Sequence, residues 1–163
     1  MSTLHHDLHC HSTWSDGVLP PADLVRRAAA RNVATLALTD HDETGGVPDA
    51  REAAATLAID LVAGVELSVT WEKNTIHIVG LAIDVECPAL QAGIESIRAG
   101  RVRRAREMAD ALAAVGIRGA WEGAQKGTLN HRTFKAMYVS WIFAVTDIVR
   151  LVSNIGDTMT PRV

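Results

Sequence analysis

The chain has 163 residues, of which 48% are hydrophobic and 21% are charged, and its formal net charge is −3. This length suits one globular domain with its own core, and two cysteines are too few for a disulfide framework. The N-terminus lacks the basic and apolar regions of a secretory signal, and apolar runs stay far below the ~20 residues of a membrane-spanning helix. We therefore expect a cytoplasmic protein without a membrane anchor.

Hydrophobic patterning predicts strands that alternate with helices over the first half of the chain. Residues 7–12 have the pattern of a short strand, and Pro20 and Pro21 begin a helix that ends near Asn32. This alternation predicts an α/β fold with a mostly parallel sheet and helices outside it, either as an open sheet or as part of a barrel. The remaining elements are a strand at 34–39, a helix at 48–57, and strands at 61–65 and 76–83.

The second half of the chain is predicted to be helical. Residues 89–115 have a helical apolar pattern, which Gly100 interrupts and Gly116 closes. Apolar residues recur at helical spacing between residues 130 and 155, at Trp141, Val145, Ile148, Val152 and Ile155. We expect two parts: residues 1–97 carry the sheet, and residues 98–163 form a helical segment.

The formal charge changes sign between these two parts. Residues 1–97 hold 5 Lys and Arg against 14 Asp and Glu, whereas residues 98–163 hold 11 against 5. The acidic, His-rich part suits cations, and the basic part suits a polyanion such as a nucleotide or nucleic acid. A solvated helix face is the alternative interpretation for the arginines at the start of the basic part, which are Arg98, Arg101, Arg103, Arg104 and Arg106.

The first candidate metal ligands lie in the predicted strand at 7–12. Alternate residues of a strand share a face, so His9 and His11 project together while Leu8 and Cys10 point the other way. Asp16, in the loop that follows, adds a carboxylate oxygen to the same ion or to a neighbouring one. The alternative is a chance His-x-His in an N-terminus that also contains His5 and His6.

Further candidates follow the next three strands. Asp40, His41 and Asp42 come directly after an apolar strand, where α/β enzymes build their sites. His41 is a natural ligand, and we expect Asp40 and Asp42 to accept hydrogen bonds from the ligand imidazoles. Glu66 ends the third predicted strand. His77 lies within the fourth, where a hydrogen-bonded core histidine is the alternative.

These segments resemble, in order, the motifs of the PHP (polymerase and histidinol phosphatase) phosphoesterases. The resemblance is close over residues 7–84 and looser over residues 98–119, and it is greatest to the branch acting on nucleoside 3',5'-bisphosphates or on the 5' end of short RNA. The motifs are Asp-Leu-His-Cys-His-Ser, Ser-Asp-Gly at 15–17, Leu-Thr-Asp-His-Asp at 38–42, Gly-Val-Glu-Leu-Ser at 64–68 and Ile-His-Ile-Val-Gly at 76–80.

The resemblance implies part of a distorted β/α barrel that holds two or three divalent metal ions. It implies hydrolysis by metal-activated water, with Asp16, His41 and Glu66 as catalytic residues and Glu66 as the bridging ligand. Mixed imidazole and carboxylate ligands suit Mn or Zn, and also Fe, better than Mg. The implied metal ligands are His9, His11, Asp16, His41, Glu66 and His77.

Complete members of this family also have a later His-Pro ligand and a terminal Asp-x-His pair. This chain has neither, and His131 is its only histidine after His77. We therefore expect a C-terminally truncated barrel, whose open sheet edge is covered by residues 138–155 or by a second copy of the chain. Arg132 is a candidate substrate-binding residue.

Three functional hypotheses remain. The first is a metal-dependent phosphoesterase acting on a phosphorylated nucleotide or short RNA. The second is a truncated metal-binding module with weak or no catalytic activity. The third is a nucleic-acid-binding helix over residues 98–106, whose affinity would depend on salt and not on metal.

Overall fold

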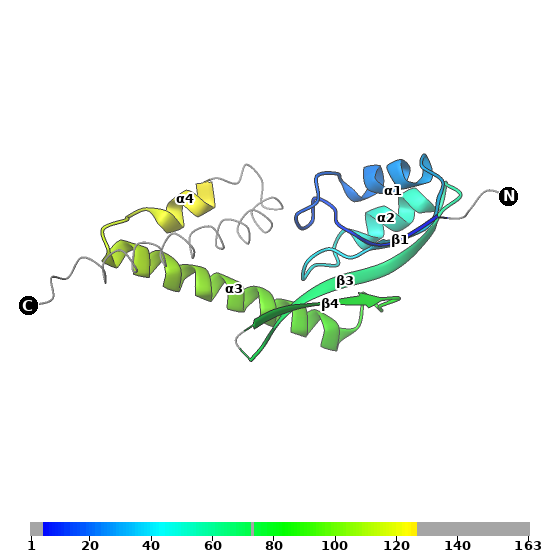
Figure 1. Ribbon diagram of the computed structural model, residues 1–163. Coiled ribbons are helices and arrows are strands. Elements are labelled where there is room, and N and C mark those ends of the chain that lie inside the picture. The colour runs from blue at the N-terminus through cyan, green and yellow to red at the C-terminus, as the bar shows by residue number, and fades with distance from the viewer. Residues whose placement is uncertain (1–4, 73, 127–163) are drawn as a thin grey trace, which may run out of the picture. The chain divides into compact units, whose positions relative to one another are not determined.

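The structure, a computed structural model, describes residues 5–72 and 74–126. In the first half of the chain strands alternate with helices (Figure 1), so the predicted α/β class is confirmed. In chain order the elements are β1 (His5–Cys10), α1 (Pro21–Ala29), β2 (Val33–Leu38), α2 (Val47–Ala54), β3 (Asp60–Trp71), β4 (Asn74–Leu81), α3 (Pro88–Ala114) and α4 (Ala120–Lys126).

The four strands form one mixed sheet in the order β1-β2-β3-β4. The pairs β1–β2 and β2–β3 are parallel, whereas β3 and β4 form an antiparallel hairpin. β3 is much longer than the predicted strand at 61–65, because it pairs with β2 over residues 60–63 and with β4 over residues 64–71. The sheet is mostly parallel, as predicted, with an antiparallel fourth strand.

The core lies between the sheet and the helices α1 and α2. Val25 of α1, Val47 of α2, and Leu36 and Leu38 of β2 are each only 1% exposed. Burying a side chain of this kind stabilises the fold by about 1.5–3 kcal/mol. Because side chains alternate across a strand, the residues between these core positions project from the opposite face of the sheet.

The edge strands β1 and β4 are more exposed than the two central strands. On the β3–β4 hairpin, Trp71 is 65% exposed and Ile78 is 51% exposed. The two coverings expected for this open edge, by residues 138–155 or by a second copy, stay predictions. The predicted apolar helix within residues 130–155 lies outside the described residues.

The chain divides into two compact units at Gly100, residues 1–100 and residues 101–163. α3 is nevertheless one continuous helix from Pro88 to Ala114, so the helix break predicted at Gly100 is wrong. A glycine inside a helix costs only about 1 kcal/mol relative to alanine, which a 27-residue helix tolerates. The boundary near residue 97 stays a prediction. None of the described helices is both long and apolar enough to span a membrane.

The arginines of α3 do not all lie on a solvated face. Arg98 donates a 3.0 Å hydrogen bond from Nη1 to Oε2 of Glu43, which is only 7% exposed. In the second unit, the guanidinium of Arg106 lies 4.4 Å from the ring centroid of Trp121. The interpretation as a solvated face is therefore wrong for Arg98, which ties α3 to the loop after β2.

Candidate metal centre

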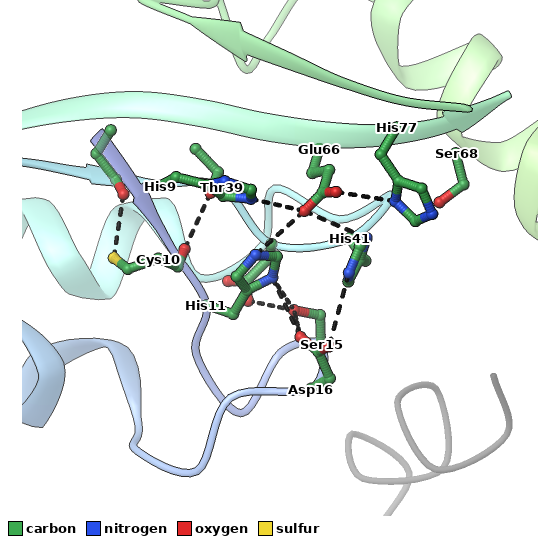
Figure 2. Close-up of polar contacts among 12 residues, drawn as sticks. His9, Cys10, His11, Ser15, Asp16, Thr39, His41, Glu66, Ser68 and His77 are labelled. Carbon is green, nitrogen blue, oxygen red and sulfur yellow. Dashed lines mark hydrogen bonds and ion pairs between the residues drawn. The ribbon is translucent and has the colours of Figure 1, made fainter. Parts of the chain in front are cut away.

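Four imidazoles surround the carboxylate of Glu66 (Figure 2). Its Oε2 lies 2.8 Å from Nε2 of His9, 3.1 Å from Nε2 of His11 and 3.6 Å from Nδ1 of His41. Its Oε1 lies 2.8 Å from Nδ1 of His77. Glu66 is therefore the centre of the cluster: its Oε2 faces three of the histidines, and its Oε1 faces the fourth.

The strand pairing brings His9, His41 and Glu66 together. Cys10 packs against the core, so its neighbour His9 projects from the opposite face of the sheet. His41 and Glu66 form a parallel bridge beyond the end of β2, closed by the backbone hydrogen bond from Glu66 to the carbonyl of Asp40. Glu66 thus lies within β3 and not at its end as predicted, because β3 continues into the hairpin.

The register of the hairpin brings His77 to the same face. Ser68 lies directly opposite His77, and Glu66 lies opposite Val79. Residues that face each other across antiparallel strands share a face, so Glu66 and His77 are diagonal neighbours. The side chain of His77 is 41% exposed, so His77 is not an enclosed core residue. Its Nδ1 contacts Glu66 instead.

Asp16 reaches the cluster from the loop between β1 and α1. Its Oδ1 lies 3.1 Å from Nδ1 of His11, and its Oδ2 lies 3.6 Å from Nε2 of His41. The loop turns back tightly, with the amide of Gly17 donating to the carbonyl of Ser12 at 2.9 Å. A Cβ atom on Gly17 would lie 2.0 Å from the carbonyl oxygen of His11, so only glycine fits there.

All six predicted ligands therefore lie together. Their nitrogen and oxygen atoms form three groups, each with all ligand atoms within 4.8 Å of one another, and neighbouring groups share a residue. Such spacing allows adjacent metal ions to share ligands. The groups are His9, His11 and Glu66; His11, Asp16 and His41; and His41, Glu66 and His77.

The electrostatics of the cluster favour the protonation states that bind a cation. Burial lowers the pKa of His41 below its ordinary value of 6.5, against the opposing charges of Glu66 and Asp16. Burial alone would raise the pKa of Glu66, but the hydrogen bond from His9 and the positive charge of the imidazoles lower it. A neutral imidazole beside an ionised carboxylate is a suitable ligand pair for a divalent metal.

One atom of the cluster has an unmet bonding capacity. Nδ1 of His41 is buried and has no hydrogen-bond partner among the described residues. A buried polar atom of this kind costs free energy unless another group binds it. The atom lies 3.6 Å from Oε2 of Glu66, and a divalent ion held by His41 and Glu66 would give it a partner, so the donor set fits a divalent metal.

Asp40 reaches the imidazoles through a serine and not by a direct hydrogen bond, so its predicted role behind the ligands stays a prediction. Its carboxylate accepts hydrogen bonds from the Ser12 amide and from the hydroxyls of Ser12 and Ser15, at 2.6–2.7 Å, and does not bond an imidazole directly. The reason is that Asp40 is 1% exposed and lies beneath the loop that carries Asp16. Asp42, with a left-handed φ of 45°, accepts a 2.8 Å hydrogen bond from the amide of Ser68.

Three residues around the site were missed in the sequence. Ser12 and Ser15 are 0% and 4% exposed and bind Asp40, although serine in a polar loop usually indicates a solvated turn. Glu43 accepts the amides of Thr44 and Gly45 at 3.1 and 3.0 Å in addition to Arg98. The Ser-x-x-Ser spacing after the His-x-His was the available signal. Arg132 lies outside the described residues.

Comparison with known proteins places these residues in a family. A 3',5'-nucleoside bisphosphate phosphatase from Chromobacterium violaceum is 55% identical over 120 residues, covering 74% of this chain and 42% of that protein. A 5'-3' exoribonuclease from Haemophilus influenzae is 44% identical over 143 residues, covering 88% and 52%. The chain thus spans about half the length of these relatives.

Solved structures give the same result. An amidohydrolase from Chromobacterium violaceum, which holds a bound sulfate and no metal, superposes with a TM-score of 0.69 at 46% identity, covering 90% of this chain and 54% of that one. A structure from Bifidobacterium adolescentis described as a candidate metal-dependent phosphoesterase has a TM-score of 0.67 at 27% identity, covering 83% and 47%. The family model of the PHP domain matches residues 7–124, and the chain belongs to the PHP domain family.

Proposed function

We propose that this chain carries the site of a divalent-metal-dependent phosphoesterase, which hydrolyses a phosphate ester of a nucleotide or of short RNA. The observation that carries the proposal is the carboxylate of Glu66 within contact distance of four imidazoles. The relatives named as a nucleoside bisphosphate phosphatase and an exoribonuclease support this substrate class. The sulfate in the Chromobacterium violaceum structure is a tetrahedral oxyanion, like phosphate.

The six clustered side chains would hold the metal ions. Glu66 would bridge, because its Oε2 faces His9 and His11 while its Oε1 faces His77. Three overlapping groups of ligands suit two or three ions. Imidazole together with carboxylate suits Mn²⁺, Zn²⁺ or Fe²⁺ better than Mg²⁺.

Divalent ions in such a site lower the pKa of a coordinated water to about 7 and neutralise phosphoryl oxygens. The side chain of Glu66, at the centre of the cluster, is 8% exposed, whereas that of Asp16 is 46% exposed. The exposed carboxylate of Asp16 would be accessible to water and substrate, as would the exposed ring of His9. His41, with its lowered pKa, presents a neutral ring between these two carboxylates. Arg132 stays a predicted contact for the substrate phosphate.

Phosphate release from adenosine 3',5'-bisphosphate with added Mn²⁺ tests the proposal. We expect Glu66→Gln to lower the rate by at least about 100-fold, because even residues behind a metal ligand contribute about 10- to 100-fold. Glu52→Gln makes the same chemical change at an exposed position of α2 and should keep the rate. Metal binding without phosphate release would instead favour a metal-binding module without catalytic activity. Equal rates in the two variants would refute the role of Glu66.

A further inference from the structure

Ser15 lies between a buried carboxylate and the cluster. Ser15 is only 4% exposed. Its Oγ lies 2.6 Å from Oδ1 of Asp40, 3.4 Å from Nδ1 of His11 and 3.3 Å from Oδ1 of Asp16. Figure 2 shows Ser15 below the ring of His11, on the side away from Glu66. It is the one described serine that contacts both Asp40 and an imidazole of the cluster.

Counting protons fixes the direction of these hydrogen bonds. A carboxylate only accepts hydrogen bonds, and a serine hydroxyl has a single proton to donate. The 2.6 Å contact to Asp40 is much shorter than the 3.3 Å contact to Asp16, so the proton of Ser15 goes to Asp40. Lone pairs of Ser15 then face His11, and Nδ1 of His11 is placed to donate to them.

We propose that Ser15 is a positioning residue that, held by Asp40, places the proton of His11 on Nδ1 and so presents Nε2 as the metal-binding atom. Nε2 lies 3.1 Å from Oε2 of Glu66, in the group that also contains His9. Histidines that bind metals usually have their second nitrogen fixed by a hydrogen bond of this kind. The inference rests on the metal-binding part of the proposed function.

Asp16 is the alternative agent, because its Oδ1 also faces Nδ1 of His11, at 3.1 Å. Its side chain is 46% exposed, so water competes for it, and it is itself a proposed metal ligand. Ser15 has no such competing role. It is buried, and its other bond ends on Asp40, which the Ser12 amide and hydroxyl hold at 2.7 Å.

The test is the ¹⁵N NMR spectrum of the His11 ring in the metal-free chain at pH 8.5. In the unmodified chain we expect the Nδ1–H tautomer to predominate, and in Ser15→Ala we expect a shift toward Nε2–H. Ser12→Ala removes a buried hydroxyl from the same carboxylate, but the Ser12 amide still holds Asp40 and the Ser15 hydroxyl still lies between Asp40 and His11, so this variant should keep Nδ1–H. A predominant Nε2–H form in the unmodified chain, or the same tautomer in all three proteins, overturns the proposal.

Metal affinity gives a second readout. We expect the dissociation constant for Mn²⁺ to rise about 10- to 100-fold in Ser15→Ala. In Ser12→Ala we expect a smaller rise. An equal rise in both variants would mean that the loss is one of stability, and would overturn the positioning role. If none of the three proteins binds Mn²⁺, the proposed function fails. The tautomer of His11 in the metal-free chain still tests the positioning role of Ser15.

Discussion

At the scale of single residues, the sequence was sufficient to find the six candidate ligands. His9 and His11 were predictable because strand alternation sends them to one face, and His41 because polar residues after an apolar strand lie at a sheet edge. Ser15 and Glu43 were not, because their importance depends on burial and on partners 25 and 55 residues away. The Ser-x-x-Ser spacing marks the position of Ser15, but it does not give the burial or the partner.

His41 makes the stability of the metal-free chain depend on pH. Its pKa is lowered in the folded chain, so on acidification the unfolded chain takes up this proton first, near pH 6.5. The contribution of neutral His41 is therefore present above pH 6.5 and is lost as the pH falls toward the lower, folded pKa. Urea unfolding should show a slope of at most about 1.4 kcal/mol per pH unit from this group.

His41→Asn should flatten that part of the profile, and His5→Asn, at an exposed position of β1, should not. Identical profiles for His41→Asn and the unmodified metal-free chain would contradict the cause assigned to the lowered pKa.

Cys10 should be inert in the folded chain. Burial, and then the charges of Asp7 and Asp40, raise its pKa to about 12, and its Sγ donates to the carbonyl of Ala37 at 3.1 Å. Since the thiolate is the reactive form, a thiol reagent at pH 8 should modify it very slowly. The measurement uses Cys87→Ser, which leaves Cys10 as the single thiol, with the urea-unfolded protein as the control. Modification in the native state as fast as in urea would show that the thiol is not buried.

At the scale of elements, the predicted order of strands and helices was correct, and the errors have physical causes. β3 extends beyond residue 65 because a strand can change partners. The prediction followed only the continuous apolar run, although residues 67–71 alternate between apolar and polar as a half-exposed strand does. Gly100 did not break α3, since one glycine is a weak signal inside a long helix. The loops between elements position the site as much as the strands do.

Gly17 tests the loop that carries Asp16. Gly17→Ala should destabilise the chain by about 1–3 kcal/mol and weaken metal binding, because the new Cβ would collide with the backbone of His11. Gly93→Ala is the matched control, since Gly93 lies in α3 with no atom within 4 Å of its added Cβ. There we expect no loss and a gain of up to about 1 kcal/mol. Thermal unfolding of both variants measures the difference, and equal effects would refute the tight turn.

Arg98 tests the contact between α3 and the loop after β2. Arg98→Ala removes a 3.0 Å hydrogen bond to the buried carboxylate of Glu43, which should cost about 1–3 kcal/mol. Arg104→Ala, an exposed arginine on the same helix, should change the free energy of unfolding by less than about 0.5 kcal/mol. Nucleic-acid binding that is lost equally in both variants, with unfolding unaffected, would instead favour a basic binding face.

At the scale of the whole molecule, the predicted resemblance to the PHP family is confirmed by the family match over residues 7–124. The four-stranded mixed sheet with its helices agrees with the predicted part of a distorted barrel, as the structural relatives show. The chain spans about half the length of the phosphatase and exoribonuclease relatives that it matches.

The central claim is that Glu66 lies at the centre of a metal site. Equilibrium dialysis against Mn²⁺ or Zn²⁺, followed by elemental analysis of the protein, tests it most directly. We predict two or three bound ions per chain, and one or none in Glu66→Gln, with Glu52→Gln unchanged. A chain that binds no ion, or a Glu66→Gln variant that binds as many as the unmodified chain, would contradict the claim.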